Sequence, residues 1–222
     1  MCGRYAYTLP HEAMRQMFGA VVANDLPIVP NFNVCPTDQV HVVYSSGDIR
    51  RLGAMRWGFT PSWYRALNDG PLLINARAET IADKPAFREA CRTRRCIIPM
   101  SGFYEWDRAG DEKLPWYIRP SHGGAFAFAG IWQDWKQAGD QGGERRQTCA
   151  MVTTGANAAM GKIHHRMPVF LAEKDWGLWL GEQGHGAATL MRPADEDAMQ
   201  FHRVSTEVNS NRASGPQLIE PI

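Results

Sequence analysis

Segments rich in β-branched and aromatic residues recur from the first third of the chain to its last quarter. Segments of this kind, bounded by turn residues, predict β-strands. Because they outnumber the helical segments and do not alternate with them, they favour a mostly antiparallel α+β domain over a doubly wound one. The strand-like segments are QVHVVYSS (39–46), LGAMRWGF (52–59), RCIIPMSGFYEW (95–106), PWYIRP (115–120), AFAFAGIWQDW (125–135), QTCAMVTT (147–154) and MPVFLA (167–172).

Three further segments, 10–20, 84–95 and 172–181, predict helices, the last through apolar residues at helical spacing. The polar stretches 107–115 and 136–147 each lie between two predicted strands, and we expect both to be hairpin connections. No linker rich in Pro, Gly and Ser divides the 222 residues. We therefore expect residues 1–222 to form one domain.

The formal net charge of +1 excludes a protein that coats duplex nucleic acid by bulk charge, so any such contact must be local. The five cysteines, an odd number, indicate a reduced, cytoplasmic setting. Cys91 and Cys96, without a second pair, give only a weak zinc signal, and we expect no metal and no cofactor. The chain has neither a signal-peptide pattern nor an apolar run of about 18 residues, so we expect no membrane partner.

The chain opens with MCGRYAY, which places a thiol directly after the initiator methionine. Cysteine is small enough that removal of Met1 is expected, and Cys2 would then carry a free amine beside its thiol. An α-amine titrates near ~7.7–8.0 and a thiol near ~8.5, so part of each is nucleophilic at neutral pH. The alternative is that Cys2 stands there by chance.

Two segments place polar side chains on predicted strands. In LLINARAET, alternation puts Asn75, Arg77 and Glu79 on one face, where arginine could bind phosphate and asparagine could fix a hydroxyl or amine. The alternative is an exposed strand face with an internal Arg–Glu pair. In SGFYEWDR, Glu105 shares a face with Phe103, and a carboxylate among apolar neighbours suits a general acid or base. An edge-strand ion pair is the alternative there.

Loop histidines and aromatic residues add two more candidates. GKIHHRMPVF places His164 ahead of an apolar strand, and histidine is the side chain best suited to move protons near neutrality, although a surface role is the alternative. RWGFTPSWYR and NFNVCPTDQV interleave aromatic residues with arginines, a composition suited to stacking on unpaired bases. We expect Trp57 to pack in the core and Trp63 to be exposed.

The ordered set MCGRY, NVCPT, RWGFTPSW, LINARAET, SGFYEW, VTTGAN, IHHRMP and PQLIEPI is too specific to be a chance collection. Over essentially the whole chain it resembles the SOS-response-associated peptidase (SRAP) domain family, whose members crosslink covalently to abasic sites in single-stranded DNA. The resemblance implies a curved, barrel-like sheet with a few flanking helices. It also implies four active-site residues, which match here as Cys2, Asn75, Glu105 and His164.

The resemblance implies aldehyde chemistry in the damage response. The Cys2 amine would condense with the C1′ aldehyde of an opened abasic sugar, and the thiol would close a thiazolidine. His164 would assist ring opening, Glu105 would manage protons, and Asn75 would hold the Cys2 backbone and the sugar. The family name also implies self-cleavage of Met1 or a peptidase activity. We expect a cytoplasmic monomer that associates with the nucleoid during damage, with lyase-type activity on the lesion.

The resemblance further implies a set of DNA contacts. Phosphates would be neutralised by arginines, a threonine would add a further contact, and two residues would shape the cleft around the lesion. Two departures from the family pattern are Cys35, where alanine is usual, and Lys84, which takes the place of a family arginine. The DNA-contact residues are Arg4, Pro36, Trp63, Arg77, Trp106, Thr153 and Arg166.

Two alternative functions remain at this point. MCG also begins the glutamine-hydrolysing domains of N-terminal-cysteine amidotransferases, but those continue with an apolar strand and later show an Asn-Gly pair, whereas position 4 here is Arg and no Asn-Gly dipeptide occurs. The second alternative is a non-catalytic module that binds single strands, in which Cys2 is incidental.

Overall fold

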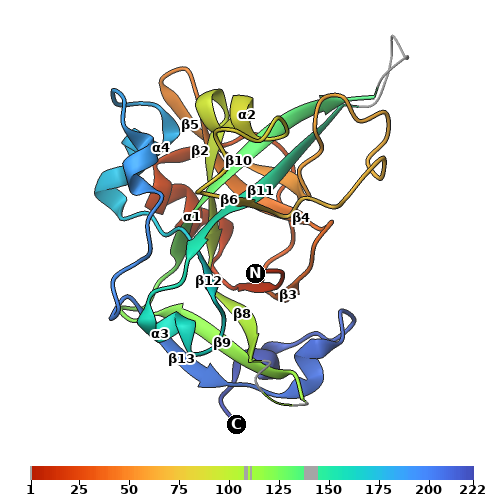
Figure 1. Cartoon of the computed structure of the whole chain (residues 1–222), viewed down its shortest axis with the longest axis vertical. Helices are drawn as coiled ribbons and strands as arrows, with labels where there is room; N and C mark the ends of the chain where they lie inside the picture. Colours follow the sequence, from red (N-terminus) through yellow and green to blue (C-terminus); the bar gives the residue numbers. More distant parts are fainter. Residues whose placement is uncertain (1, 108–109, 111, 138–144) are drawn as a thin grey trace.

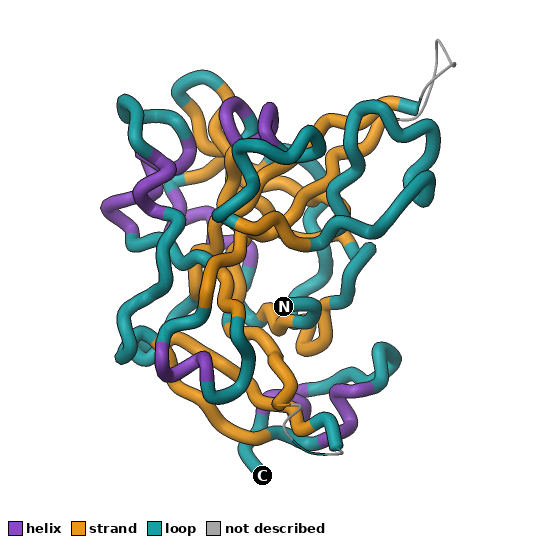
Figure 2. Tube along the Cα trace, viewed as in Figure 1, coloured by secondary structure: helices purple, strands orange, loops and turns teal. Residues whose placement is uncertain are grey.

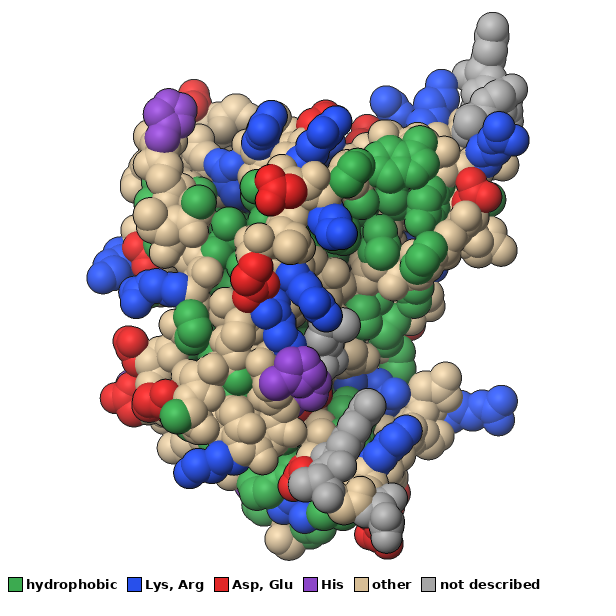
Figure 3. Space-filling view, in the orientation of Figure 1, with side chains coloured by type: hydrophobic (Ala, Val, Ile, Leu, Met, Phe, Trp, Pro, Cys, Tyr) green, Lys and Arg blue, Asp and Glu red, His purple; other side chains and the backbone are tan. Residues whose placement is uncertain are grey.

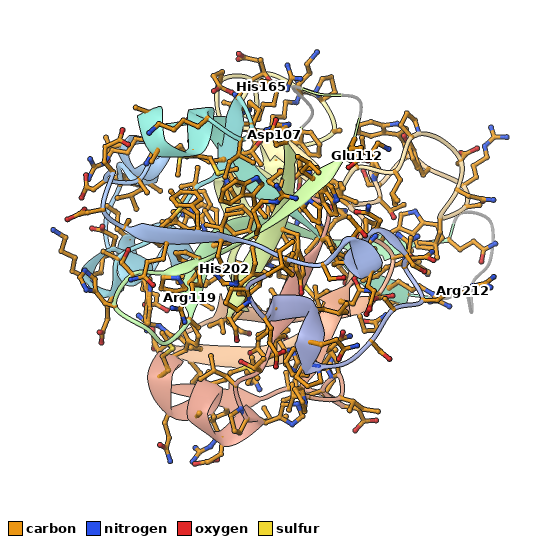
Figure 4. All side chains as sticks on the ribbon, turned by 90° about the horizontal axis from the view of Figure 1, so that it is seen from below. Asp107, Glu112, Arg119, His165, His202 and Arg212 are labelled. Carbon is orange, nitrogen blue, oxygen red and sulfur yellow. The ribbon has the colours of Figure 1, made fainter. Side chains whose placement is uncertain are left out.

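The structure is a computed structural model of the chain and describes residues 2–107, 110, 112–137 and 145–222. Two sheets dominate it, a larger one in the upper part of Figure 1 and a smaller one below. The fold is α+β with mainly antiparallel strands, as predicted. Figure 2 shows most helical segments at the periphery of the strands.

The larger sheet closes into a five-stranded barrel. Antiparallel pairing runs along β11, β10, β7, β4 and β5, and a parallel pairing of Thr148 with Arg56 and of Cys149 with Trp57 joins β11 back to β5. Closure satisfies edges that an open sheet would leave unpaired. The strands of this sheet are β2 (Ala20–Val22), β4 (Gln39–Ser46), β5 (Ile49–Trp57), β7 (Arg95–Met100), β10 (Phe126–Lys136), β11 (Arg145–Gly155) and β12 (Arg166–Pro168), with β6 (Asn75–Arg77) paired to β11.

The smaller sheet takes its strands from both ends of the chain. Its order is β13 (Met199–Arg203), β9 (Leu114–Pro120), β8 (Gly102–Asp107), β1 (Tyr5–Tyr7) and β3 (Asn31–Val34). In the view from below, the labelled side chains of Arg119 on β9 and His202 on β13 mark two neighbouring strands of this sheet. It packs its own small cluster around Tyr104, Tyr117 and Val204.

The predicted strand 95–106 is in fact two strands, β7 in the barrel and β8 in the smaller sheet. The break falls at Ser101, whose N–H donates to Ala6 O at 3.0 Å and whose hydroxyl accepts from Thr8 N at 2.9 Å. A Cβ on Gly102 would lie 2.4 Å from the Tyr117 ring and 2.6 Å from Ile118 O, so glycine is required where the two strands approach. The periodicity of side chains carried no sign of this change of sheet.

The three predicted helices are present as α1 (His11–Phe18), α2 (Arg88–Thr93) and α4 (Trp176–Leu180). α1 buries Met14 and Phe18 and ends at Gly19, which has a φ of 58°. The 3-10 turn η1 (Glu173–Asp175) directly precedes α4, within the predicted segment 172–181. Four short elements were not predicted, namely α3 (Ala158–Gly161) and the 3-10 turns η2 (Ala187–Leu190), η3 (Thr206–Asn209) and η4 (Pro216–Ile219). No helix in the described part of the chain has the length and apolar character needed to cross a membrane.

Both predicted hairpins are confirmed by antiparallel pairing of β8 with β9 and of β10 with β11, although residues 108–109, 111 and 138–144 of their connections lie outside the described residues. The predicted strand 167–172 is shorter than expected, because β12 ends at Pro168 and only Phe170 continues the pairing, as a bridge to Phe128. Trp57 is fully buried and Trp63 is 56% exposed, both as predicted.

His41 on β4 is 2% exposed, and its ring stacks on Tyr7 with centroids 4.3 Å apart. Burial, with the nearby His11, lowers the pKa of His41 to about 3. In the unfolded chain its pKa is about 6.5, so below that pH the unfolded state binds the proton that the folded state refuses. The contribution of His41 to the stability of the fold is therefore fully present above about pH 6.5 and is lost as the pH falls toward 3.

We expect wild-type protein to lose about 3 kcal/mol more unfolding free energy than His41→Phe between about pH 7 and about pH 4.5. Urea unfolding of both proteins at the two pH values measures this double difference. Other titrating groups are common to both proteins and cancel. An identical pH dependence for the two proteins would contradict the assignment.

Candidate active site

Cys2 lies between the two sheets, and Figure 1 shows the start of the chain in the middle of the molecule. The residue is 1% exposed. The side-chain amide of Asn75 donates to Cys2 O at 3.0 Å. Asn75 is itself held by the parallel pairing of β6 with β11, in which it lies opposite Met151. The barrel thus fixes the backbone that carries the N-terminal thiol.

Glu105 on β8 is 3% exposed, and the pairing of Tyr5 with Phe103 sets β8 beside the strand that follows Cys2. Burial, and then the charge of Glu105, raise the pKa of the Cys2 thiol well above its usual range. The thiol is therefore protonated at neutral pH. A reaction at its sulfur must include transfer of that proton to a nearby base.

His164 follows α3, and its N–H donates to Met160 O at 2.9 Å. Its Nδ1 lies 3.0 Å from the N–H of Arg166, which can only donate, and 3.2 Å from Arg166 O, which can only accept. The shorter contact favours an accepting Nδ1, and with it a neutral ring whose proton is on Nε2. Burial lowers the pKa of His164, while the charge of Glu105 opposes that shift. The imidazole is thus kept mainly neutral at pH 7, and its ring stacks on His165 at 4.5 Å.

The three arginines predicted to contact phosphates lie in different surroundings. Arg166 is 9% exposed; it donates to both carboxylate oxygens of Glu79, at 2.7 and 2.9 Å, and to Thr153 O at 2.7 Å. Arg4 donates to Asn33 Oδ1 at 2.6 Å and to Val208 O at 2.8 Å. Arg77 is exposed. Their roles toward DNA stay predictions, and Arg77 is the arginine presented to solvent.

The predicted polar face of LLINARAET is only partly correct. Asn75 and Arg77 alternate with the buried Ala76, but β6 ends at Arg77, so Glu79 lies in the turn beyond the strand. Glu79 pairs with Arg166, 87 residues away, and not with Arg77. The alternative of an Arg–Glu pair internal to this segment is therefore wrong.

A hollow of about 590 Å³ opens beside Asn75. Trp63, Leu73 and Phe87 supply its apolar lining, and Arg77 and Lys84 supply positive charge. In the space-filling view, Lys and Arg side chains gather on this face near histidine side chains, beside a hydrophobic patch. The combination suits a polyanion with aromatic bases.

Of the remaining predicted contacts, Trp106 and Pro36 lie on the side of the smaller sheet, whereas Thr153 lies on β11 of the barrel. The Trp106 indole donates to Asn209 Oδ1 at 2.6 Å, and the Arg4 guanidinium lies 6.0 Å from its ring centre. Pro36 is half-buried, next to Cys35, whose thiol donates to Asn33 O at 3.3 Å. Thr153 is fully buried and accepts from Arg166 through its hydroxyl at 3.2 Å.

Sequence reasoning missed Asn33 and Asn209, which anchor Arg4 and Trp106. Both are ordinary polar residues in short elements, and their partners lie up to 103 residues away, so no local pattern marks them. Among the described residues, no group of three or more His, Cys, Asp and Glu side chains is arranged to hold a metal ion.

The fold and this site agree with one family of proteins. A family model described as SOS response associated peptidase (SRAP) matches residues 1–211, and the chain belongs to that family. The abasic site processing protein YoqW of Bacillus subtilis is 36% identical over 227 residues, which cover 99% of each chain.

More distant relatives share the same description. The abasic site processing protein YedK of Escherichia coli is 29% identical over 230 residues, covering all of both chains. The abasic site processing protein HMCES of Gallus gallus is 29% identical over 227 residues, covering 87% of this chain and 66% of that protein. A crystal structure of a protein from Bacteroides thetaiotaomicron matches over the full length of both chains with a TM-score of 0.87 and 26% identity.

Proposed function

We propose that this protein captures abasic sites in single-stranded DNA by forming a covalent thiazolidine through Cys2. The observation that carries the proposal is the N-terminal cysteine fixed by Asn75 at 3.0 Å, in a buried position where the charge of Glu105 acts on both its thiol and His164. Family membership and relatives named as abasic site processing proteins support the substrate.

The reaction conserves atoms in two steps once Met1 is removed. The Cys2 amine adds to the C1′ aldehyde of the opened sugar, and water leaves to give an imine. The thiol then adds to the imine carbon, its proton passes to the nitrogen, and a five-membered ring closes. Because the thiol is protonated at rest, Glu105 serves as the local base and acid for these transfers.

His164 acts earlier, on the closed sugar. A neutral imidazole with its proton on Nε2 donates that proton to the ring oxygen as the C1′–O bond breaks. Asn75 keeps the Cys2 carbonyl, and with it the amine, in a constant position toward the sugar. An imine that escapes ring closure undergoes β-elimination, which accounts for a lyase-type side reaction.

The proposed preference for single-stranded DNA follows from the burial of Cys2. Its reactive atoms lie between the sheets, so the sugar must come to them, and an unpaired nucleotide avoids most of the unstacking cost. Arg77 and Lys84 would neutralise phosphates beside Trp63, on which a flanking base would stack. From the family resemblance, Arg4 and Arg166 would also neutralise phosphates, in addition to the protein acceptors to which they donate.

The proposal extends to the protein as a whole. Residues 1–222 would act as one domain and as a monomer, in the cytoplasm and at the nucleoid during DNA damage. Cleavage of Met1 by the protein itself would expose the amine of Cys2, with Glu105 and His164 as the groups that transfer protons.

Denaturing electrophoresis tests the proposal. Protein mixed with abasic single-stranded DNA should give a denaturant-resistant band, whereas intact DNA of the same sequence should not. Release of ammonia from glutamine without such a band would favour the amidotransferase, and neither product would favour a reversible binding module.

Replacing Arg77 with alanine is expected to weaken binding to intact and abasic single strands alike, by about three- to tenfold at low salt. Arg77 is exposed, and a phosphate contact carries no information about the lesion. Fluorescence anisotropy with both DNAs over a series of salt concentrations measures the effect, and the salt dependence should become shallower. A loss confined to abasic DNA would rule out this role.

A further inference from the structure

The short helix α3, which precedes His164, is held at its N-terminal end by a distant segment. Ala158 N and Ala159 N donate to the two carboxylate oxygens of Glu196, at 2.8 and 2.7 Å. Met160 N donates to Asn157 Oδ1 at 2.9 Å. The N–H groups that a helix start leaves without intrahelical partners are thus taken up by side chains, two of them by a carboxylate.

The start of α3 also donates hydrogen bonds to the segment that carries Glu196. The side-chain amide of Asn157 donates to Ala194 O at 3.1 Å and to Asp195 O at 3.3 Å. Residues 157–160 and 194–196 therefore hold each other through donors and acceptors on both sides. We call this arrangement the clasp.

The clasp is connected through the α3 turn to His164, the candidate proton donor. Met160, fully buried, closes the helical turn through its carbonyl oxygen, which accepts from Ile163 N and His164 N, both at 2.9 Å. On the other side, Arg166 N donates to His164 Nδ1. The imidazole is thus fixed between the clasped turn and β12.

We propose that Glu196 and Asn157 are positioning residues for His164, which they act on through the α3 turn without contacting DNA. This inference rests on the proposed function, because it assigns to the clasp the orientation of the imidazole during sugar opening. Glu196 is exposed, so it contributes little to the core, yet its carboxylate binds two backbone N–H groups of the turn. Misplacement of a reacting group by about 1 Å can lower the rate by up to about 100-fold, so a smaller displacement is expected to have a smaller but measurable effect.

The test compares crosslinking kinetics of variants on abasic single-stranded DNA. Glu196→Ala should lower the crosslinking rate at saturating protein by about fivefold, the effect of losing a helix cap, with the half-saturating concentration unchanged. Glu196→Gln keeps one acceptor oxygen and should recover part of that rate. Glu173→Ala, which removes another exposed carboxylate outside the clasp, is the control and should crosslink like wild type.

Asn157→Asp separates the two functions of Asn157. It retains the acceptor for Met160 N and loses the donors to Ala194 and Asp195. We expect a rate loss like that of Glu196→Ala, and a double variant that is no slower than the slower single one, since both act on one turn.

A spectroscopic measurement separates positioning from a general loss of structure. In wild-type protein, the ¹⁵N shifts of His164 should report one neutral tautomer with its proton on Nε2, and Glu196→Ala should report a mixture of tautomers. An unchanged rate in Glu196→Ala, an equal loss of intact-strand binding, or an unchanged tautomer would overturn the inference. Absence of crosslinking by wild-type protein would instead refute the proposed function. The tautomer measurement would still show whether the clasp orients the His164 ring.

Discussion

Cys2→Ala protein is expected to yield no denaturant-resistant crosslink to abasic single-stranded DNA, a loss of at least about a hundredfold. The variant keeps an N-terminal amine and still forms an imine, but no thiol is present to close the ring. Binding to intact strands should stay near the wild-type level, because phosphate contacts do not involve the thiol. Gel-resolved time courses and anisotropy with the same DNA measure the two quantities.

Two controls accompany this variant. Cys35→Ala removes a half-buried thiol near Asn33 and should crosslink at the wild-type rate. A protein in which Met1 is retained should fail as completely as Cys2→Ala, since its amine and thiol would belong to different residues and could not close a five-membered ring. Mass spectrometry of the adduct must find a peptide that starts at Cys2. A crosslinked peptide with any other start would contradict the mechanism.

Glu105→Gln should slow crosslinking by about a hundredfold or more, the usual effect of removing a general acid–base group. The buried carboxylate raises the pKa of the Cys2 thiol and also that of His164. Its loss therefore lowers both pKa values, so the thiol ionises more readily while the crosslinking reaction loses its proton carrier. Glu105→Gln is therefore expected to raise the rate of one reaction of Cys2, alkylation of its thiol, and to lower the rate of another, crosslinking to DNA.

Alkylation of Cys2 by a neutral reagent, followed peptide by peptide, should accordingly become faster in Glu105→Gln while crosslinking becomes slower. A variant that had merely lost structure would alkylate faster at Cys96 and Cys149 as well, which are fully buried. Glu173→Gln, which makes the same chemical change at an exposed carboxylate, is the matched control and should crosslink within about twofold of wild type. Slower alkylation of Cys2 in Glu105→Gln would contradict the electrostatic assignment.

The long strands were predictable because each runs through the core and repeats its pattern over many residues. QVHVVYSS corresponds to β4 over its full length, and AFAFAGIWQDW to most of β10. Strands of three residues, such as β1 and β6, are too short to show a period, and pairing with distant partners defines them. The change of sheet at Gly102 depends on the ring of Tyr117, which local sequence cannot reveal.

The candidate residues were identified from motifs, but their contacts were not. Asn75 and Cys2 are 73 residues apart, and only the parallel pairing of β6 with β11 brings the amide to the Cys2 carbonyl. Arg166 was predicted to contact phosphate because of the family resemblance. Its burial against Glu79 and Thr153 depends on where β12 enters the sheet, which no pattern in its own segment indicates.

The position of the two chain ends has a consequence for engineering. Cys2 is enclosed between the sheets, whereas Ile222 is 76% exposed and the C-terminus lies at the outer end of the molecule in Figure 1. A fluorescent protein, an affinity tag or a second domain joined ahead of Cys2 would place its nitrogen in a peptide bond, where it could not condense with an aldehyde. The same partner joined after Ile222 would extend into solvent, so fusions that preserve the proposed reaction belong at the C-terminus.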